Sequence, residues 1–393
     1  MKNKPKKFTH FISTTTFSKL LFNTARRLIY PFAPELARGL NVDLSAITSV
    51  IALNQATGLL GPVGASFADQ YGYRLFMLIS LTMLAIGTFA LGIIPIYSML
   101  MVCFLLTGLA KSIFDTSLQA YISNLVPLEK RGKIIGITEL SWSGSTLIGI
   151  PATGWIIQHF SWQTPFFIIS GLALVCFFLL LITMPKPLKA PLADKKPMAM
   201  ATGWGQILQN KKVLSILCFV FFLSIANDNL FVIYGVWLEQ SYHLTLVAIG
   251  MGTIFIGLAE ILGESCTALF ADRMGLKPSI LTGGLLCSLF CFVLPILDIG
   301  LAYVLSGLFL IFFTFEFTMV TAMSLSTELV PELRASTMSA FFATAGLGRM
   351  IGAVSGGILW TNSGVLSIAL VSGGCVLASL VCFIFGFTKC RIP

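Results

Sequence analysis

Charged side chains are scarce in this sequence. They make up 10% of its 393 residues, whereas hydrophobic residues make up 56%. A water-soluble domain normally carries about a quarter charged residues, which cover its surface. This composition therefore excludes a soluble globular protein of this size, and the long apolar runs need another environment.

Patterns typical of catalysis and of metal binding are also missing. The histidines His10, His159 and His243 are scattered, and the nine cysteines form no CxxC pattern. The chain has no G-x-x-x-x-G-K-[ST] sequence that could hold the phosphates of ATP. The sequence thus predicts no enzyme, no metal site and no cofactor, and we expect the cysteines to pack as small apolar residues.

What the sequence does contain is a series of twelve apolar stretches. A helix needs about 20 residues to cross the bilayer core, and helices satisfy their own backbone hydrogen bonds there. The runs are continuous, unlike the alternating segments of a membrane barrel. The expected spans are roughly 17–40, 45–68, 74–95, 97–125, 133–158, 164–184, 213–239, 246–271, 276–297, 299–328, 335–360 and 364–387.

Basic residues follow the connections between these spans. Twenty of the 25 lie near the termini or in even-numbered connections, and the other five are Arg26, Arg27, Arg38, Lys111 and Arg349. Cytoplasmic loops carry the excess of Lys and Arg, so we expect both termini in the cytoplasm. The basic residues behind the net charge of +9 then serve to orient the protein in the membrane, and the charge predicts no nucleic-acid partner.

A charged decapeptide occurs twice. Residues 65–74 read ASFADQYGYR, and residues 268–277 read ALFADRMGLK, 203 positions later. SNLVPLEKRGK at 123–133 and STELVPELRAS at 326–336 repeat at nearly the same offset. Two repeats at nearly one offset predict two six-helix halves of the same orientation. The expected parts are a cytoplasmic tail 1–16, a bundle 17–184, a cytoplasmic linker 185–212, a bundle 213–388 and a tail 389–393.

In these features the whole chain resembles the major facilitator superfamily. The decapeptide is similar to that family's loop G-x-x-x-D-R-x-G-R-[RK], although Gln70 replaces the usual Arg in the first copy. The resemblance implies an all-α integral membrane fold with twelve transmembrane helices in two pseudo-symmetric six-helix bundles. It also implies that the loop latches the two halves in the outward-open state, with a simple topogenic turn as the alternative. The matching residues are Asp69, Gly72, Arg74, Asp272, Arg273, Gly275 and Lys277.

Ionisable residues inside the spans are the candidates for function. A charge at the bilayer centre costs a few kcal/mol or more, so it must be paired or line a wet cavity. In the resembled fold, spans one, four, seven and ten line the central cavity, and here all four carry charge. The candidates for substrate binding are Arg26, Arg27, Tyr30, Lys111, Asp115, Asn227, Asp228 and Glu316. The candidates for proton coupling are Asp115, Asp228, Glu260, Glu264 and Glu316.

Spacing suggests partners for some of these charges. Lys111 and Asp115 lie four residues apart on one helix, and Glu316 and Arg349 lie at similar estimated depths on consecutive spans. Both pairs could equally be structural. Arg26 or Arg27 is expected to meet Asp115, Asp228 or the substrate.

Two short elements bear on the kind of substrate. YPFAP at 30–34 resembles the P-x-x-P element of drug/proton antiporters, and GIPATG at 149–154 partly matches an exporter motif whose glycines also suit helix packing. Arg27, however, stands where cation exporters often carry an acid. A basic first half suits an anionic or zwitterionic substrate better than a cation.

The sequence therefore predicts a secondary transporter that works by alternating access. We expect a monomer in a bacterial inner membrane whose partners are a small organic solute, the proton and membrane lipids. The alternatives are a multidrug exporter of lipophilic compounds and a lipid-handling flippase. A membrane enzyme or a sensor lacks the residue cluster or the added domain that it would need.

Overall fold

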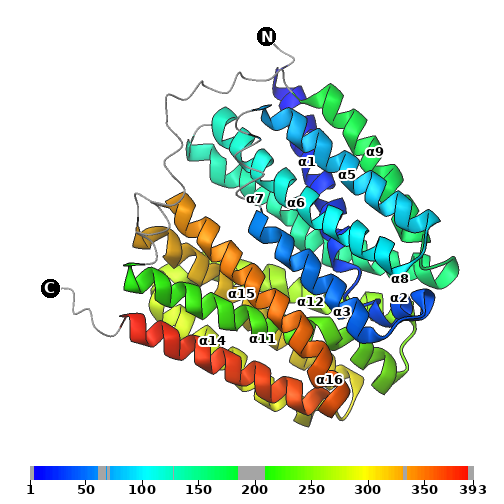
Figure 1. Cartoon of the computed structure of the whole chain (residues 1–393). Coiled ribbons are helices and arrows are strands. Elements are labelled where there is room, and N and C mark those ends of the chain that lie inside the picture. The colour runs from blue at the N-terminus through cyan, green and yellow to red at the C-terminus, as the bar shows by residue number, and fades with distance from the viewer. Residues whose placement is uncertain are drawn as a thin grey trace. The chain divides into compact units, whose positions relative to one another are not determined.

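The computed structural model describes residues 4–60, 68, 71–126, 128–184, 209–330 and 334–387. Within these ranges every regular element is a helix, and no strand occurs (Figure 1). The chain divides into two compact units. Unit 1 comprises Met1–Ala193 and Leu244–Ile254, and unit 2 comprises Asp194–His243 and Phe255–Pro393.

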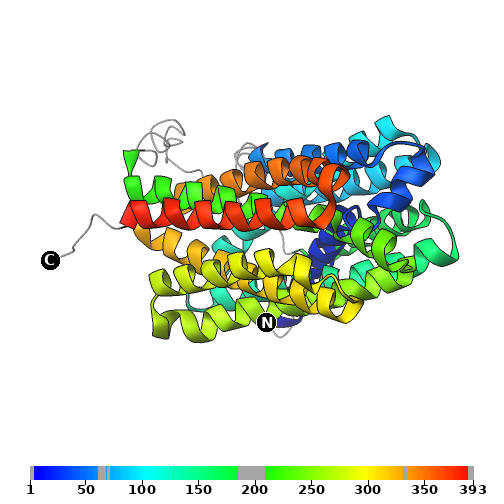
Figure 2. The same ribbon diagram turned by 90° about the horizontal axis from the view of Figure 1, so that it is seen from below.

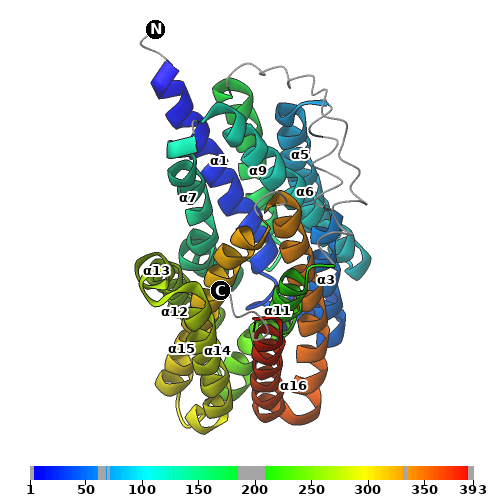
Figure 3. The same cartoon turned by 90° about the vertical axis from the view of Figure 1, so that its left-hand side faces the viewer.

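Unit 1 is built around its first helix, α1. This helix packs against α6, α7 and α9, and Figure 3 shows it passing between α7 and α9. The helices of this unit are α1 (Lys4–Arg27), α2 (Ala33–Leu40), α3 (Leu44–Ala56), η1 (Thr57–Leu60), α5 (Tyr73–Ile93), α6 (Tyr97–Leu125), α7 (Leu128–Gly144), η2 (Ser145–Gly149), α8 (Ile150–His159) and α9 (Thr164–Thr183).

The first expected span, 17–40, differs from the helix that forms. α1 already begins at Lys4 and ends at Arg27, and α2 starts again at Ala33. Pro31 lies in the break, where its ring and its missing N–H oppose a continuous helix. The helix thus includes much of the stretch expected as a tail, and it places Lys19 about four turns inside α1.

Unit 2 contains the two longest helices of the described chain, α11 and α16. The helices of this unit are α11 (Lys211–Tyr242), α12 (Leu246–Cys266), η3 (Thr267–Ala271), α13 (Asp272–Met274), α14 (Leu276–Val293), η4 (Leu294–Leu297), α15 (Leu301–Leu329) and α16 (Arg334–Phe387). The start of α12, up to Ile254, belongs to unit 1. α16 breaks at Gly364, whose φ is 62° and ψ −150°, so it forms the two spans expected at 335–360 and 364–387.

The α11 and α16 helices run side by side (Figure 2). Their contact follows a row of glycines on α16. A Cβ added to Gly352 would lie 2.7 Å from the Ile225 carbonyl oxygen, and one added to Gly356 would lie 2.7 Å from the Asn229 carbonyl oxygen. Small residues at this spacing let the two backbones approach closely, as the glycine pattern predicts.

Both units repeat one packing pattern. In unit 1, α5 packs against α6 and α9, and in unit 2, α14 packs against α15 and α16. The helix after each decapeptide also starts at a glycine with positive φ, 102° at Gly72 and 86° at Gly275. Glycine adopts such a φ readily because it has no Cβ.

Eight described helices are long and apolar enough to cross a membrane, or nine if the bent pair α2 and Leu44–Leu60 forms one span. The count of nine is lower than twelve because α16 is counted once, α1 is too polar on average and the fifth span is interrupted by the π-helix η2. All twelve expected ranges correspond to helices in the described parts of the chain.

Candidate functional site

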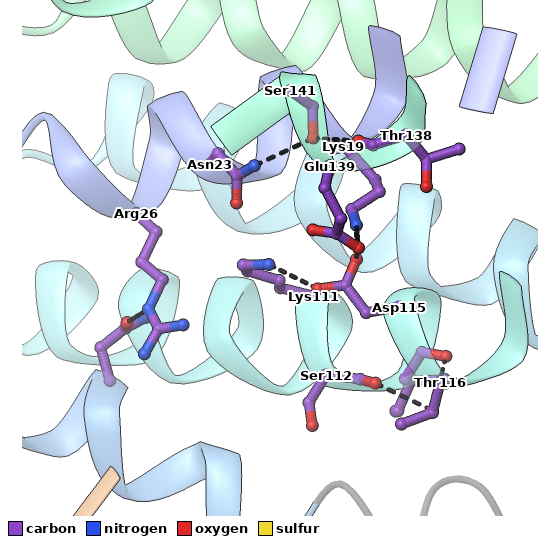
Figure 4. Close-up of polar contacts among 12 residues, drawn as sticks. Lys19, Asn23, Arg26, Lys111, Ser112, Asp115, Thr116, Thr138, Glu139 and Ser141 are labelled. Carbon is purple, nitrogen blue, oxygen red and sulfur yellow. Dashed lines mark hydrogen bonds and ion pairs between the residues drawn. The ribbon is translucent and has the colours of Figure 1, made fainter. Parts of the chain in front are cut away.

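Four charged side chains of unit 1 form a chain of ion pairs (Figure 4). Lys19 Nζ on α1 lies 2.6 Å from Glu139 Oε1 on α7 and 3.8 Å from Asp115 Oδ1 on α6. The other oxygen of Asp115, Oδ2, lies 2.5 Å from Lys111 Nζ, one turn away on the same helix. The order is therefore Glu139, Lys19, Asp115, Lys111, and the predicted Lys111–Asp115 contact is present.

The two lysines of this chain are buried, with Lys19 2% and Lys111 8% exposed. A buried ammonium is tolerated only when an anion lies close to it. Asp115 supplies that anion to both lysines, whereas the Glu139 side chain is 46% exposed. Asp115 is thus the central anion of the site.

Arg26 points from α1 toward α3. Its Nε donates to Asn54 Oδ1 at 2.8 Å, and its Nη2 donates to Gln55 Oε1. The two amides are themselves held, because Asn54 Nδ2 donates to the Phe104 carbonyl at 2.6 Å and Gln55 Nε2 donates to the Tyr30 hydroxyl at 2.5 Å. These neutral amides hold the guanidinium in position.

Arg27 takes a different direction from its neighbour. It is buried, and its guanidinium carbon lies 4.4 Å from the centroid of the Trp142 ring on α7. The face of an indole ring attracts a cation. The two neighbouring arginines therefore have different partners, Arg26 on α3 and Arg27 on α7, which the sequence alone does not distinguish.

Unit 2 holds a second polar group on α11. Asp228 Oδ2 lies 3.9 Å from Arg349 Nε on α16, and Asn227 Nδ2 donates to the same oxygen at 3.4 Å. One residue further, Asn229 Oδ1 accepts a hydrogen bond of 2.6 Å from Ser355 Oγ on α16. Arg349 thus lies beside Asp228, a partner that the spacing argument did not name.

Three glutamates of unit 2 lie where α12 approaches α15. Glu260 is buried, and Glu264 and Glu316 are partly exposed. A Cβ added to Gly263, next to Glu264, would lie 3.0 Å from Glu316 Cβ, so the two helices touch at this level. Each of the three glutamates has an interaction partner.

The decapeptide residues are described only in part. Asp69 and the side chain of Asp272 lie outside the described residues, so their role stays a prediction. Arg273 is exposed. Arg74 Nη2 donates to the Leu181 carbonyl in the last turn of α9 at 2.7 Å. In the second copy, Lys277 Nζ lies 5.0 Å from the centroid of the Phe387 ring at the end of α16.

Several of these residues were not singled out from the sequence. From the sequence, Lys19 belongs to the basic residues near the N-terminus, and Asn54, Gln55 and Trp142 are ordinary residues of the expected spans. Polar amides within an apolar span and the helical spacing of Lys19 from Arg26 are the signals that point to them. Among the described residues no three His, Cys, Asp or Glu side chains lie close enough to hold a metal ion.

Comparison with known proteins shows the family to which the chain belongs. A family model described as "Major Facilitator Superfamily" matches residues 15–353, and a second match covers residues 216–389. The chain is 26% identical over 344 residues to an uncharacterized MFS-type transporter, YceJ, of Bacillus subtilis (strain 168), which covers 86% of this chain and 85% of the relative.

Two further similarities agree with this result. Multidrug resistance protein MdtG of Escherichia coli O17:K52:H18 (strain UMN026 / ExPEC) is 24% identical over 276 residues, 67% of this chain and 66% of the relative. The crystal structure of a bacterial homolog of the human lysosomal transporter Spinster has a TM-score of 0.76 at 13% identity, and covers 97% of this chain and 96% of that one. The predicted all-α twelve-helix fold is thereby confirmed, and the chain belongs to the Major Facilitator Superfamily of integral membrane transporters.

Proposed function

We propose that this protein is a secondary active transporter of the bacterial inner membrane that moves a small organic anion or zwitterion. It works by alternating access, is coupled to protons and acts as a monomer surrounded by lipid. The bacterial relatives and the apolar helices support the location. The distribution of lysines and arginines supports cytoplasmic termini.

The balance of charge in unit 1 is the observation that carries the proposal for the substrate. The described site contains the cations Lys19, Arg26, Arg27 and Lys111. It contains two carboxylates, Asp115 and Glu139. Cations that exceed the anions in an apolar surrounding attract a negatively charged ligand. Arginine also fits a carboxylate or a phosphate with two parallel hydrogen bonds.

Asp115 offers a physical route to proton coupling. An anionic group that approaches Lys111 competes with Asp115 for the ammonium. Asp115 then keeps only Lys19, 3.8 Å away, and a carboxylate that loses one of its two cations in an apolar surrounding takes up a proton more readily. Substrate binding and proton uptake at Asp115 would then be linked, and Asp228 beside Arg349 is placed to do the same in unit 2.

Counterflow in proteoliposomes tests the proposal. Liposomes that contain the purified protein are preloaded with one solute from a panel of organic anions, zwitterions and lipophilic cations, and uptake of the labelled solute is measured. We expect counterflow with anions or zwitterions and a change of internal pH that accompanies net transport. Counterflow with lipophilic cations alone would overturn the proposed substrate class.

A multidrug exporter of lipophilic compounds is the second candidate. The name of the relative MdtG and the YPFAP sequence at 30–34 favour it. The buried position of Arg27 on Trp142 opposes it, since a cationic drug would meet a like charge there. A lipid-handling flippase would show transfer of labelled lipid between leaflets in the same liposomes.

A further inference from the structure

Asn23 stands on the charged face of α1. It lies four residues after Lys19 and three before Arg26, and side chains at these spacings share one face of a helix. Figure 4 shows it between Arg26 and the Lys111–Asp115 pair. The residue is only 1% exposed, so both ends of its amide must find partners inside the protein or in a ligand.

The hydrogen bonds around Asn23 fix the orientation of its amide. Ser141 Oγ on α7 donates its single hydrogen to the Thr138 carbonyl at 2.7 Å. The same oxygen can then only accept from Asn23, and Asn23 Nδ2 lies 3.3 Å away. The amide nitrogen therefore faces Ser141, and the amide oxygen Oδ1 faces away from it.

This amide oxygen is a buried acceptor without a protein donor. Among the described residues, Asn23 Oδ1 has no hydrogen-bond partner. An acceptor left in that state destabilises the protein, because it loses its hydrogen bonds to water and gains none in return. Asp115 Oδ1 also lacks a hydrogen bond, but it lies 3.8 Å from Lys19 Nζ, whereas Asn23 Oδ1 is a neutral acceptor beside the charged residues and indicates a position where a ligand donates.

We infer that Asn23 Oδ1 accepts a hydrogen bond from a hydroxyl or amino group of the substrate. The anionic group of that substrate binds to the neighbouring cations Lys111 and Arg26. The substrate is then a small carboxylic acid with a hydroxyl or amino group close to its carboxylate. This inference rests on the proposed function and narrows its substrate class.

Matched pairs of acids test the inference. Malate is compared with succinate, lactate with propionate, and aspartate with succinate, each as a competitor of counterflow in proteoliposomes. The wild-type protein should prefer the hydroxy or amino acid about three- to tenfold, the value of one neutral hydrogen bond. Asn23→Leu, which has a similar shape but no acceptor, should bind the unsubstituted acid as before and lose the preference.

Two further variants distinguish a loss of the Asn23 hydrogen bond from a general effect of substitution in α1 or from misfolding. Ser18→Ala is the matched control, because Ser18 is equally buried on α1 and its hydroxyl donates to the Thr14 carbonyl of its own helix at 2.8 Å. It should keep the preference. Ser141→Ala removes the bond that orients the amide, so it should reduce the preference even if Asn23→Leu does not fold.

The possible failures separate the two claims. A wild-type protein that transports acids without preference for the hydroxy or amino member would overturn this inference, with a bound water as the partner of Asn23. Equal losses for both members of a pair in Asn23→Leu would overturn it as well. If no acid in the panel supports counterflow, the proposed function fails, and this inference fails with it.

Discussion

Asp115 holds two buried ammonium groups in place. Lys19 and Lys111 both depend on it, and Glu139 reaches only Lys19. Removing the acid from a buried ion pair leaves an uncompensated charge, which costs far more than the net value of the pair. The chain of ion pairs therefore predicts an unequal response of the two acids to neutral substitution.

Asp115→Asn should destabilise the protein by on the order of 3 kcal/mol and abolish transport. Glu139→Gln should cost less than about 1 kcal/mol, since its side chain is half exposed and solvent screens it. Unfolding in detergent, followed by fluorescence, measures both variants. Equal destabilisation would contradict the central place of Asp115.

Arg26 and Arg27 allow a second comparison at this scale. Arg26→Lys loses the separate Nε and Nη2 donors that reach Asn54 and Gln55, and with them the planar group that fits a carboxylate. We expect about tenfold weaker binding of an anionic substrate and unchanged binding of its neutral ester. Arg27→Lys keeps a cation near Trp142 and serves as the matched variant.

The sequence suggests that Arg26 or Arg27 meets the substrate without separating them. If Arg26→Lys weakens the acid and the ester equally, or neither, that arginine is a structural partner only. If only Arg27→Lys weakens the acid, the substrate contact belongs to Arg27. Titration of the purified variants with both ligands distinguishes these results.

The sequence identifies charged residues far better than it pairs them. Lys111–Asp115 could be predicted because both lie on one helix, where a spacing of four residues determines proximity. Lys19 was missed because the start of α1 lies well before the apolar run. Arg349 lies beside Asp228, 121 positions earlier in the chain, and such a contact depends on how α11 packs on α16.

At the scale of elements, glycines determine how α16 packs. Gly352 faces the α11 backbone, where an added Cβ would lie 2.9 Å from Asp228 Cβ. Gly374, in the second segment of α16 beyond the break at Gly364, has nothing within 4 Å of an added Cβ. The same substitution at these two glycines should therefore have different effects.

Gly352→Ala should destabilise the protein by about 1–3 kcal/mol, because α11 and α16 must separate. It should also disturb the neighbouring Asp228–Arg349 contact and lower transport. Gly374→Ala should be neutral or stabilise the helix by up to about 1 kcal/mol, since alanine favours a helix over glycine. The midpoint of thermal unfolding in detergent measures both, and a neutral Gly352→Ala would refute close packing at this position.

Breaks in the helices were harder to predict than the helices themselves. Apolar length marks all twelve spans, but it does not reveal that the first span stops at Arg27 or that η2 interrupts the fifth. The prolines Pro31 and Pro151 lie at or next to these breaks. They could have been read as helix breakers, whereas the π-helical turn depends on the neighbours of η2 and has no signal of its own in one sequence.

At the scale of the whole molecule, corresponding helices of the two halves are joined by a hydrogen bond, although the donor lies on the opposite helix of each pair. In unit 1, Ser170 Oγ on α9 donates to the Ala85 carbonyl on α5, at 2.9 Å. In unit 2, Ser288 Oγ on α14 donates to the Gly373 carbonyl on α16, at 3.1 Å. The repeated decapeptides indicate this duplication in the sequence, because one precedes α5 and the other precedes α14, the corresponding helix of the second half.

The orientation of the molecule is a separate prediction. We expect single cysteines at positions 70 and 273, in a protein whose own nine cysteines are replaced, to react with an impermeant maleimide only after the cells are opened. The same label should reach a cysteine at position 96, in the connection between the third and fourth spans, in intact cells. Labelling of position 70 or 273 from outside would reverse the topology.

The last prediction concerns the first decapeptide as a conformational latch. A carboxylate near the start of a helix accepts backbone N–H groups and interacts favourably with the positive end of the helix dipole. Asp69 precedes the glycine turn at Gly72 and the start of α5, so its neutral substitute Asn would weaken such a contact without removing any cation from the substrate site. Asp69→Asn should therefore lower the turnover number more than the apparent affinity.

Asp272→Asn, in the second copy, should have a smaller effect if the first copy is the principal latch. Initial rates of counterflow over a range of substrate concentrations separate the two parameters. If Asp69→Asn protein at normal expression has the turnover number of the wild type, the first decapeptide is only a turn between spans and not a latch.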